Sequence, residues 1–142
     1  MRYICPVCFK IAEVGEEKCS NCGYDFKNIS DDDYSEKLIK ALNHPDYNVA
    51  YMAAKIIGEL KIKKAEGELI KYLQNSVKTR KDPYIEQMVV WALGEIGGEK
   101  SYKFLLKNRD KFSILTKNII EDSLKKIKTR MANKTHGNMS IP

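Results

Sequence analysis

The chain of 142 residues is long enough for one ordinary core with a small appendage, and its 43% apolar and 31% charged residues, at a net charge of +6, are typical of a soluble globular protein. These values exclude a fibrous, collagenous or wholly disordered chain. The longest apolar runs are far below the ~20 residues of a membrane span, and no apolar signal segment follows the first residues, so we expect a protein of the reducing cytoplasm without a membrane partner.

The first predicted element is a metal site formed by the only four cysteines of the chain. Cys5, Cys8, Cys19 and Cys22 have the spacing C-x2-C-x10-C-x2-C, in which each short pair can hold one side of a tetrahedral ion. Thiolates in a tetrahedral set favour zinc, with iron as the main competitor. Four thiolates close the coordination shell, so we expect one structural zinc ion per chain. An iron site for electron transfer and a thiol-exchange site are the alternatives.

The segment 1–28 around these cysteines resembles the prokaryotic zinc ribbons, which implies a small β-hairpin fold. Gly23 follows the last cysteine and can take the positive φ that a metal-binding turn often requires, whereas Phe9 stands at the corresponding place after Cys8. The segment has too few apolar residues to bury a core of its own. We therefore expect zinc to supply folding free energy on the order of 10 kcal/mol.

Residues 29–33 are polar and acidic, which predicts a linker that leads into a helix. Ser30 or Asp31 can cap that helix, and the aspartates suit the positive end of its dipole. From residue 34 onward the apolar period is helical, and no alternating strand pattern is convincing. A mainly α domain is therefore expected over residues 34–130.

The helical region contains an internal repeat of 36 residues. The segment NVAYMAAKIIGEL (48–60) aligns without gaps on YIEQMVVWALGEI (84–96), and the stretches that follow the two segments also correspond. Each unit is thus predicted to be a pair of amphipathic helices. Its first helix nears its end at Gly58 or Gly94, a residue that suits a close helix crossing or a C-terminal cap.

Half units extend the array at both ends. The segment KLIKAL (37–42) repeats the pattern of the second helix of a unit. The segment NIIEDSLKKI (118–127) is similar to the first helix, with Ile119 aligned on Met88. We expect about five helices in a short α-helical solenoid, with the ribbon as a candidate cap for the first half unit.

The two aligned segments carry a family resemblance. HPDYNVAYMAAKIIGEL and DPYIEQMVVWALGEIGG contain much of the motif D-P-x-x-x-V-R-x-x-A-x-x-A-L-G-x-L-G, so residues 34–128 resemble the HEAT-like repeats first associated with phycobilisome lyases. The resemblance implies a solenoid that serves mainly as a protein-binding scaffold, with only some members acting on chromophores. The usual arginine after the valine is Ala50 in one unit and Glu86 in the other.

Patterns for catalysis are missing from the sequence. His44 beside Pro45 and His136 near the C-terminus have no partner four residues away on a helix and no nucleophile nearby in sequence. There is no P-loop, no dinucleotide-binding glycine motif and no nucleophile elbow. We therefore name no catalytic residue and no small-molecule substrate, and a lyase-type enzyme ranks third among the functions considered.

Aromatic side chains form the first candidate binding surface. Tyr84, Met88 and Trp91 stand at i, i+4 and i+7 on a helix face next to the predicted apolar stripe. Only one of the three equivalent positions in the earlier unit is apolar, so repeat packing alone does not require aromatic residues here. These residues either bind a protein partner or cover a neighbouring helix or the docked ribbon.

Basic side chains form the second candidate surface. Residues 100–142 hold eleven basic and three acidic side chains. Four of the basic side chains cluster near the end of the last helix, namely Lys125, Lys126, Lys128 and Arg130. They form either a solvated face or a contact for nucleic acid or the ribosome. The polar segment 131–142 that follows is predicted to be a disordered tail.

Two functions of different classes follow from these patterns. The leading one is a non-enzymatic, zinc-binding module that recognises another protein through the surface of the solenoid. The alternative is an RNA- or ribosome-associated factor that uses the basic helix end and the ribbon.

Overall fold

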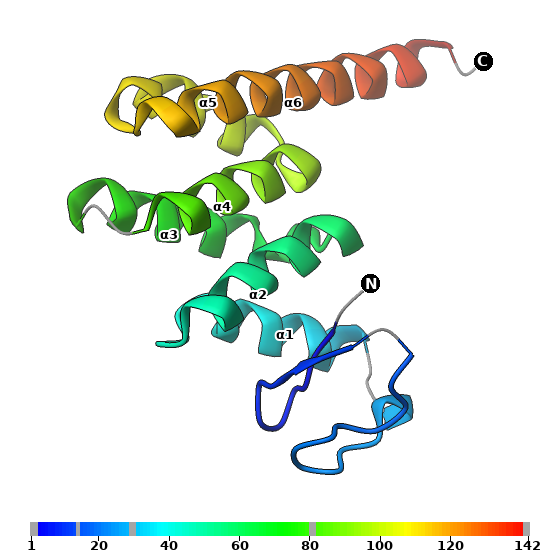
Figure 1. Cartoon of the computed structure of the whole chain (residues 1–142). Coiled ribbons are helices and arrows are strands. Elements are labelled where there is room, and N and C mark those ends of the chain that lie inside the picture. Colours follow the sequence, from blue (N-terminus) through cyan, green and yellow to red (C-terminus); the bar gives the residue numbers. More distant parts are fainter. Residues whose placement is uncertain (1–2, 14, 29–30, 80–81, 141–142) are drawn as a thin grey trace.

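The structure of the chain is a computed structural model that describes residues 3–13, 15–28, 31–79 and 82–140. Paired helices stack on one another, with the cysteine-containing segment at one end of the stack and the last helix pair at the other (Figure 1). In the described residues the helices are α1 (Asp31–Ala41), α2 (Tyr47–Leu60), α3 (Glu66–Thr79), α4 (Pro83–Ile96), α5 (Glu99–Asn108) and α6 (Ile114–Ser140). The predicted mainly α solenoid is confirmed.

The predicted total of about five helices is one too low. The two complete pairs form four helices, and the half units at the two ends add one helix each. The N-terminal ends of α2 and α4 show the repeat in atomic detail. Asp46 and Asp82, 36 residues apart, accept hydrogen bonds from the backbone N–H of Asn48 (2.9 Å) and Tyr84 (2.7 Å) respectively.

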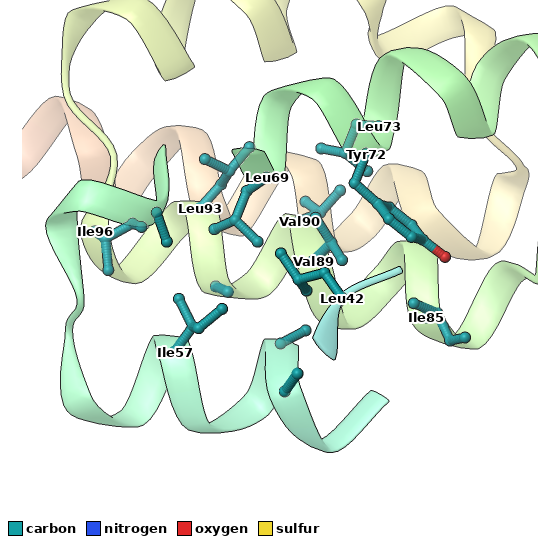
Figure 2. Close-up of a cluster of buried hydrophobic side chains, with 14 of the residues drawn as sticks. Leu42, Ile57, Leu69, Tyr72, Leu73, Ile85, Val89, Val90, Leu93 and Ile96 are labelled. Atoms are coloured by element: carbon teal, nitrogen blue, oxygen red, sulfur yellow. The ribbon is translucent and has the colours of Figure 1, made fainter. Parts of the chain in front are cut away.

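Helix α4 lies at the centre of the packing. It contacts α2 on one side, α6 on the other and α3 across the repeat, while α1 packs on α2 and α5 on α6. Figure 2 shows the buried cluster between these helices. Val89 and Leu93 of α4 meet Leu69 and Leu73 of α3 there, and all four side chains are fully buried. The α2, α4 and α6 helices thus form one layer, whose exposed side carries the surface described below.

The glycines of the repeat permit close helix crossings. A Cβ atom added at Gly58 would overlap the ring of Trp91, and one added at Gly94 would lie 2.5 Å from Ser123 Oγ. Gly58 therefore lets α4 approach α2, and Gly94 lets α6 approach α4. Of the two roles expected for these glycines, the structure supports the crossing. Helix α2 is instead capped by Lys61, whose φ of 54° is left-handed.

The cysteine-containing segment is a small hairpin docked on α1 and α2. Strands β1 (Tyr3–Ile4) and β2 (Ile11–Ala12) pair antiparallel, with Ile4 opposite Ile11. The Ile4 side chain is 2% exposed and belongs to the same buried cluster as Tyr34 of α1, while the Ile4 N–H donates to Tyr34 Oη at 3.0 Å. The hairpin therefore covers the first helices of the stack, as a solenoid cap does.

Two predicted boundaries differ from the elements of the structure. Helix α1 begins at Asp31, inside the predicted linker 29–33, because its acidic first turn is compatible with the positive end of the helix dipole. Ser30, the other predicted cap, lies outside the described residues. Helix α6 continues through Ser140 and includes most of the segment for which the sequence predicts a disordered tail. The domain limits and the disorder of the tail stay predictions for measurement in solution.

Candidate metal centre and α4–α6 groove

The four cysteines sit in two turns of the same construction. In the first turn the Cys5 N–H donates to the Lys10 carbonyl and the Phe9 N–H donates to the Cys5 carbonyl, both at 2.8 Å. In the second turn the Cys19 N–H donates to the Tyr24 carbonyl and the Gly23 N–H to the Cys19 carbonyl, again at 2.8 Å. Each turn aims two sulfur atoms at the same point, which is the arrangement that a tetrahedral metal site requires.

Phe9 occupies the position that favours glycine. Its φ is 63°, close to the 79° of Gly23 at the matching place in the second turn. A bulky residue in the left-handed region is costly, so its contacts must offset the strain. The Phe9 ring lies 5.4 Å from the His44 ring, centroid to centroid, and thereby joins the first cysteine turn to the loop between α1 and α2.

The sulfur atoms of the cysteines are spaced as metal ligands. All four lie within 4.8 Å of one another, with Cys5 Sγ 3.5 Å from Cys22 Sγ and Cys8 Sγ 3.6 Å from Cys19 Sγ. A tetrahedral ion with metal–sulfur bonds of about 2.3 Å places its ligands about 3.8 Å apart, whereas a disulfide needs about 2.05 Å. The cluster therefore fits a metal ion and not a pair of disulfides.

The surroundings of Cys5 and Cys8 shift the pKa values of the two thiols in opposite directions. Burial raises the pKa of the Cys5 thiol to about 12. Burial acts to raise the pKa of Cys8 as well, but hydrogen bonds from Asn21, from the Lys10 backbone and from Cys19 outweigh it and lower the pKa to about 6. A bound cation would favour the thiolate form of all four side chains. These residues could hold one metal ion as a closed four-sulfur site with no open position for a substrate.

The protein purified without added metal is expected to contain about one equivalent of zinc per chain, because four thiolates at tetrahedral spacing select a soft divalent ion. Elemental analysis by mass spectrometry measures the zinc and iron content directly. Recovery of about one equivalent of iron instead would identify a rubredoxin-like site. Metal-free protein with fully folded hairpin resonances in an NMR spectrum would contradict the assignment.

Helices α4 and α6 form the second candidate site, and polar contacts along both helices fix their spacing. Near the start of α6, Thr116 Oγ1 donates to Glu86 Oε1 at 2.7 Å. In the middle, Ser123 Oγ donates to the Val90 carbonyl at 3.0 Å. Towards the end, Arg130 Nη2 donates to the carbonyl oxygens at the C-terminal end of α4, including that of Gly94 at 3.0 Å. The distance between the two helices is therefore set along most of α4.

A cavity of about 490 Å³ lies on the exposed side of the layer formed by α2, α4 and α6. It brings the three predicted aromatic-face residues together. Helix α4 contributes Tyr84, Gln87, Met88 and Trp91, and Tyr51 of α2 closes one side. Helix α6 contributes Ile119, Asp122, Ser123, Lys125 and Lys126. The cavity thus combines an apolar floor with two of the predicted basic residues at its edge.

A second cavity of about 450 Å³ continues from the first towards the end of α6. It shares Lys125 and Lys126 with the first and adds Glu95, Arg130 and Asn133. The two adjoining cavities together are called the α4–α6 groove below. Lys128, the fourth predicted basic residue, lines neither cavity and is exposed.

Trp91 packs on a neighbouring helix and also lines the groove. Its ring packs on Gly58 of α2, and the same partly buried side chain lines the groove. Lys126 Nζ lies 6.0 Å from the ring centroid and forms an ion pair of 2.8 Å with Glu95. Tyr84, in contrast, is 65% exposed and does not belong to the buried cluster of the described residues.

Comparison with known proteins identifies the repeat. Residues 35–125 match the family described as HEAT repeats, over more than half of the chain. The chain belongs to the HEAT-repeat family. HEAT repeats commonly mediate protein interactions. No curated protein and no solved structure gave a significant match. In the part of the chain that the structure describes, none of the HEAT helices is long and apolar enough to cross a membrane.

Several groove residues of the HEAT repeats were not predicted from the sequence, among them Tyr51, Gln87, Asp122 and Ser123. The alignment of Ile119 on Met88 indicated that these two residues face the same surface, because equivalent residues of successive repeats lie side by side in a solenoid. The alignment could not show that the intervening surface is hollow. That feature depends on the side-chain volumes of three helices at once.

Proposed function

We propose that the protein is a non-enzymatic interaction module of the cytoplasm. In this proposal a zinc-bound ribbon closes one end of a HEAT-repeat scaffold, and the α4–α6 groove binds another protein. Free thiols grouped as metal ligands fit a reducing compartment, which supports the cytoplasm. The likeness to repeats of phycobilisome lyases rests on the two repeat motifs alone, and no residue for chromophore chemistry has been identified.

The observation that carries the proposal is the first cavity of the groove. It joins Tyr84, Met88 and Trp91, residue types that are typical of binding hot spots, in a hollow on the exposed side of the helix layer. Unlike other exposed apolar side chains such as Ile114 and Leu115, Tyr84 lies beside Met88 and Trp91 in one cavity. A desolvated aromatic pocket supplies affinity through buried apolar area, which suits a protein segment better than a polar nucleic-acid backbone.

The alternative of an RNA- or ribosome-associated factor draws on the basic end of α6. Two of its four cations already have partners within the chain, because Arg130 binds carbonyl oxygens of α4 and Lys126 pairs with Glu95. Acidic Glu95 and Asp122 lie beside them along the groove. The same groove contains the aromatic cavity, whose apolar lining a phosphate backbone would leave unused, so we favour the protein partner.

Trp91→Ala is expected to weaken binding of the partner by about 2 kcal/mol or more, roughly a thirtyfold change in Kd, because truncation removes the largest side chain of the pocket. The partner is recovered from lysate of the source cells with nuclease present, and its affinity is then measured with purified proteins by calorimetry. Tyr84→Ala is the second variant, since its exposed ring supports no core contact. Leu106→Ala on α5, which removes a partly exposed side chain away from the groove, is the control.

The same titrations discriminate between the two functions through their dependence on salt. A protein partner held mainly by the aromatic pocket should lose affinity with salt much less steeply than a phosphate backbone does. Three results together would establish nucleic-acid binding in place of the proposal. The interaction would be lost on nuclease treatment, and Trp91→Ala would leave the affinity unchanged. The affinity would also fall steeply with salt, and this dependence would become weaker on removal of each of Lys125, Lys126, Lys128 and Arg130.

A further inference from the structure

The two surfaces that the sequence kept apart, one aromatic and one basic, meet in the α4–α6 groove. We infer that this groove binds an acidic peptide segment of another protein. A bulky apolar side chain of that segment enters the first cavity, and carboxylates further along the segment lie in the second. The inference rests on the proposed function and adds the chemistry of the partner.

The apolar end of the groove selects the anchor side chain. Met88 and Trp91 are partly buried, and each offers carbon or sulfur surface to the cavity from α4, opposite Ile119 on α6. A methionine among aromatic residues adapts its shape to different apolar side chains. An anchor such as Leu, Phe or Met would bury this surface together with its own.

The basic end selects the carboxylates. The second cavity is lined by three cations, Lys125, Lys126 and Arg130, and by one acid, Glu95. The hydrogen bonds of Arg130 to carbonyl oxygens leave its charge uncompensated, and the Glu95 carboxylate is paired with Lys126 alone. A net positive charge therefore remains at this end, and Lys125, which is exposed and lines both cavities, is placed to bind the first carboxylate of the segment.

The length of the groove sets the spacing within the peptide. Its α6 wall runs from Ile119 to Asn133, which is about 21 Å at the helix rise of 1.5 Å per residue. The centres of the two cavities lie about seven residues apart along α6, or about 10 Å. A helical partner would thus carry its acids about four to seven residues from the anchor, on one side of it in sequence, and an extended partner about three residues from it.

The experiment first selects peptides that bind the protein and then reverses charges on the protein and on the peptides. A phage library of random 16-residue peptides is panned on the immobilised full-length protein, and enriched peptides are synthesised without tryptophan and with a fluorophore for anisotropy. Because Trp91 is the only tryptophan of the chain, its emission reports whether a peptide fills the first cavity. Enriched peptides are expected to carry an apolar anchor and, at the spacing given above on one side of it, Asp or Glu, and to shift the emission of Trp91.

Lys125→Glu is expected to weaken these peptides at least tenfold, whereas Lys128→Glu, with the same charge change outside both cavities, should change the affinity less than twofold. A peptide whose acids are replaced by lysine should bind the wild type poorly and recover on the Lys125→Glu variant. Circular dichroism of both variants checks that the helices are retained.

Three other outcomes would overturn the inference in distinguishable ways. Peptides that shift Trp91 emission without enriched acids, or that respond equally to Lys125→Glu and Lys128→Glu, would remove the acidic partner but leave the proposed protein-binding groove. Peptides that neither shift Trp91 emission nor respond to either variant would remove both. Tight binding of a single-stranded RNA homopolymer that both charge reversals weaken equally would replace the peptide by nucleic acid.

Discussion

Cys19→Ser is expected to unfold the ribbon and to leave most of the helical signal in place. Among the described residues of the ribbon only a few apolar side chains are buried, such as Ile4 and Ala12, so we expect a bound metal to supply folding free energy on the order of 10 kcal/mol. The helices bury their own cluster, centred on α4. Far-ultraviolet circular dichroism, combined with zinc content and hairpin NMR resonances, measures both parts of the prediction.

Loss of the ribbon would also uncover its docking surface. Tyr34 would lose the Ile4 N–H as a hydrogen-bond donor, and His44 would lose the Phe9 ring. Increased binding of an apolar dye and fraying of α1 should therefore accompany the loss of metal. Ser20→Ala, an exposed change between Cys19 and Cys22, should retain zinc and fold. Collapse of the helical signal in Cys19→Ser would mean that the ribbon is an essential cap and that no domain boundary lies near Asn28.

The clustering of the four cysteines was largely predictable because it depends on local sequence. Two C-x-x-C turns determine where four sulfur atoms can point, and the spacing between the turns allows them to converge. The backbone conformation of Phe9 was harder to predict from the sequence. A glycine at that place would have indicated positive φ, whereas phenylalanine at 63° is held there by a ring contact with His44, 35 residues further along the chain.

The helices were predictable for a different reason, the 36-residue repeat. The same repeat failed to show that the aromatic and basic surfaces form one groove. Ile119 aligns on Met88 at an offset of 31 residues, so α6 falls outside the strict period. The placement of Lys125 beside Trp91 follows from the close α4–α6 crossing at Gly94 and Ser123. Such a crossing depends on packing between helices that sequence periodicity does not describe.

The acid that replaces the usual arginine was visible in the sequence, but its partners were not. Glu86 is 6% exposed and accepts hydrogen bonds from Ser76 Oγ of α3 at 2.8 Å and from Thr116 Oγ1 of α6 at 2.7 Å. In a sequence, these two hydroxyl residues look like any surface serine and threonine. In the structure both are buried, so one carboxylate links three helices.

Glu86→Ala is therefore expected to lower the free energy of unfolding by about 3–5 kcal/mol. The change leaves a cavity and removes the acceptor of two buried hydroxyl groups, each of which costs about 1–3 kcal/mol when it loses its partner. Glu86→Gln keeps the shape and one acceptor, so it should cost about 1 kcal/mol. Urea unfolding followed by circular dichroism measures all variants. Glu121→Ala, which removes only an exposed ion pair with Arg109, is the control and should stay within about 1 kcal/mol of the wild type.

Glu86→Arg, which restores the usual residue of the motif, should be the most destabilising of the series. The two side chains that hydrogen-bond Glu86 are uncharged hydroxyl groups, so neither would compensate the charge of a buried guanidinium. Because Thr116 joins α6 to α4 at one end of the groove, loss of this contact should also weaken peptide binding although Glu86 lines neither cavity. Equal stability of the alanine and glutamine variants would show that the three-helix contact does not hold the groove, and that the other contacts between α4 and α6 are sufficient.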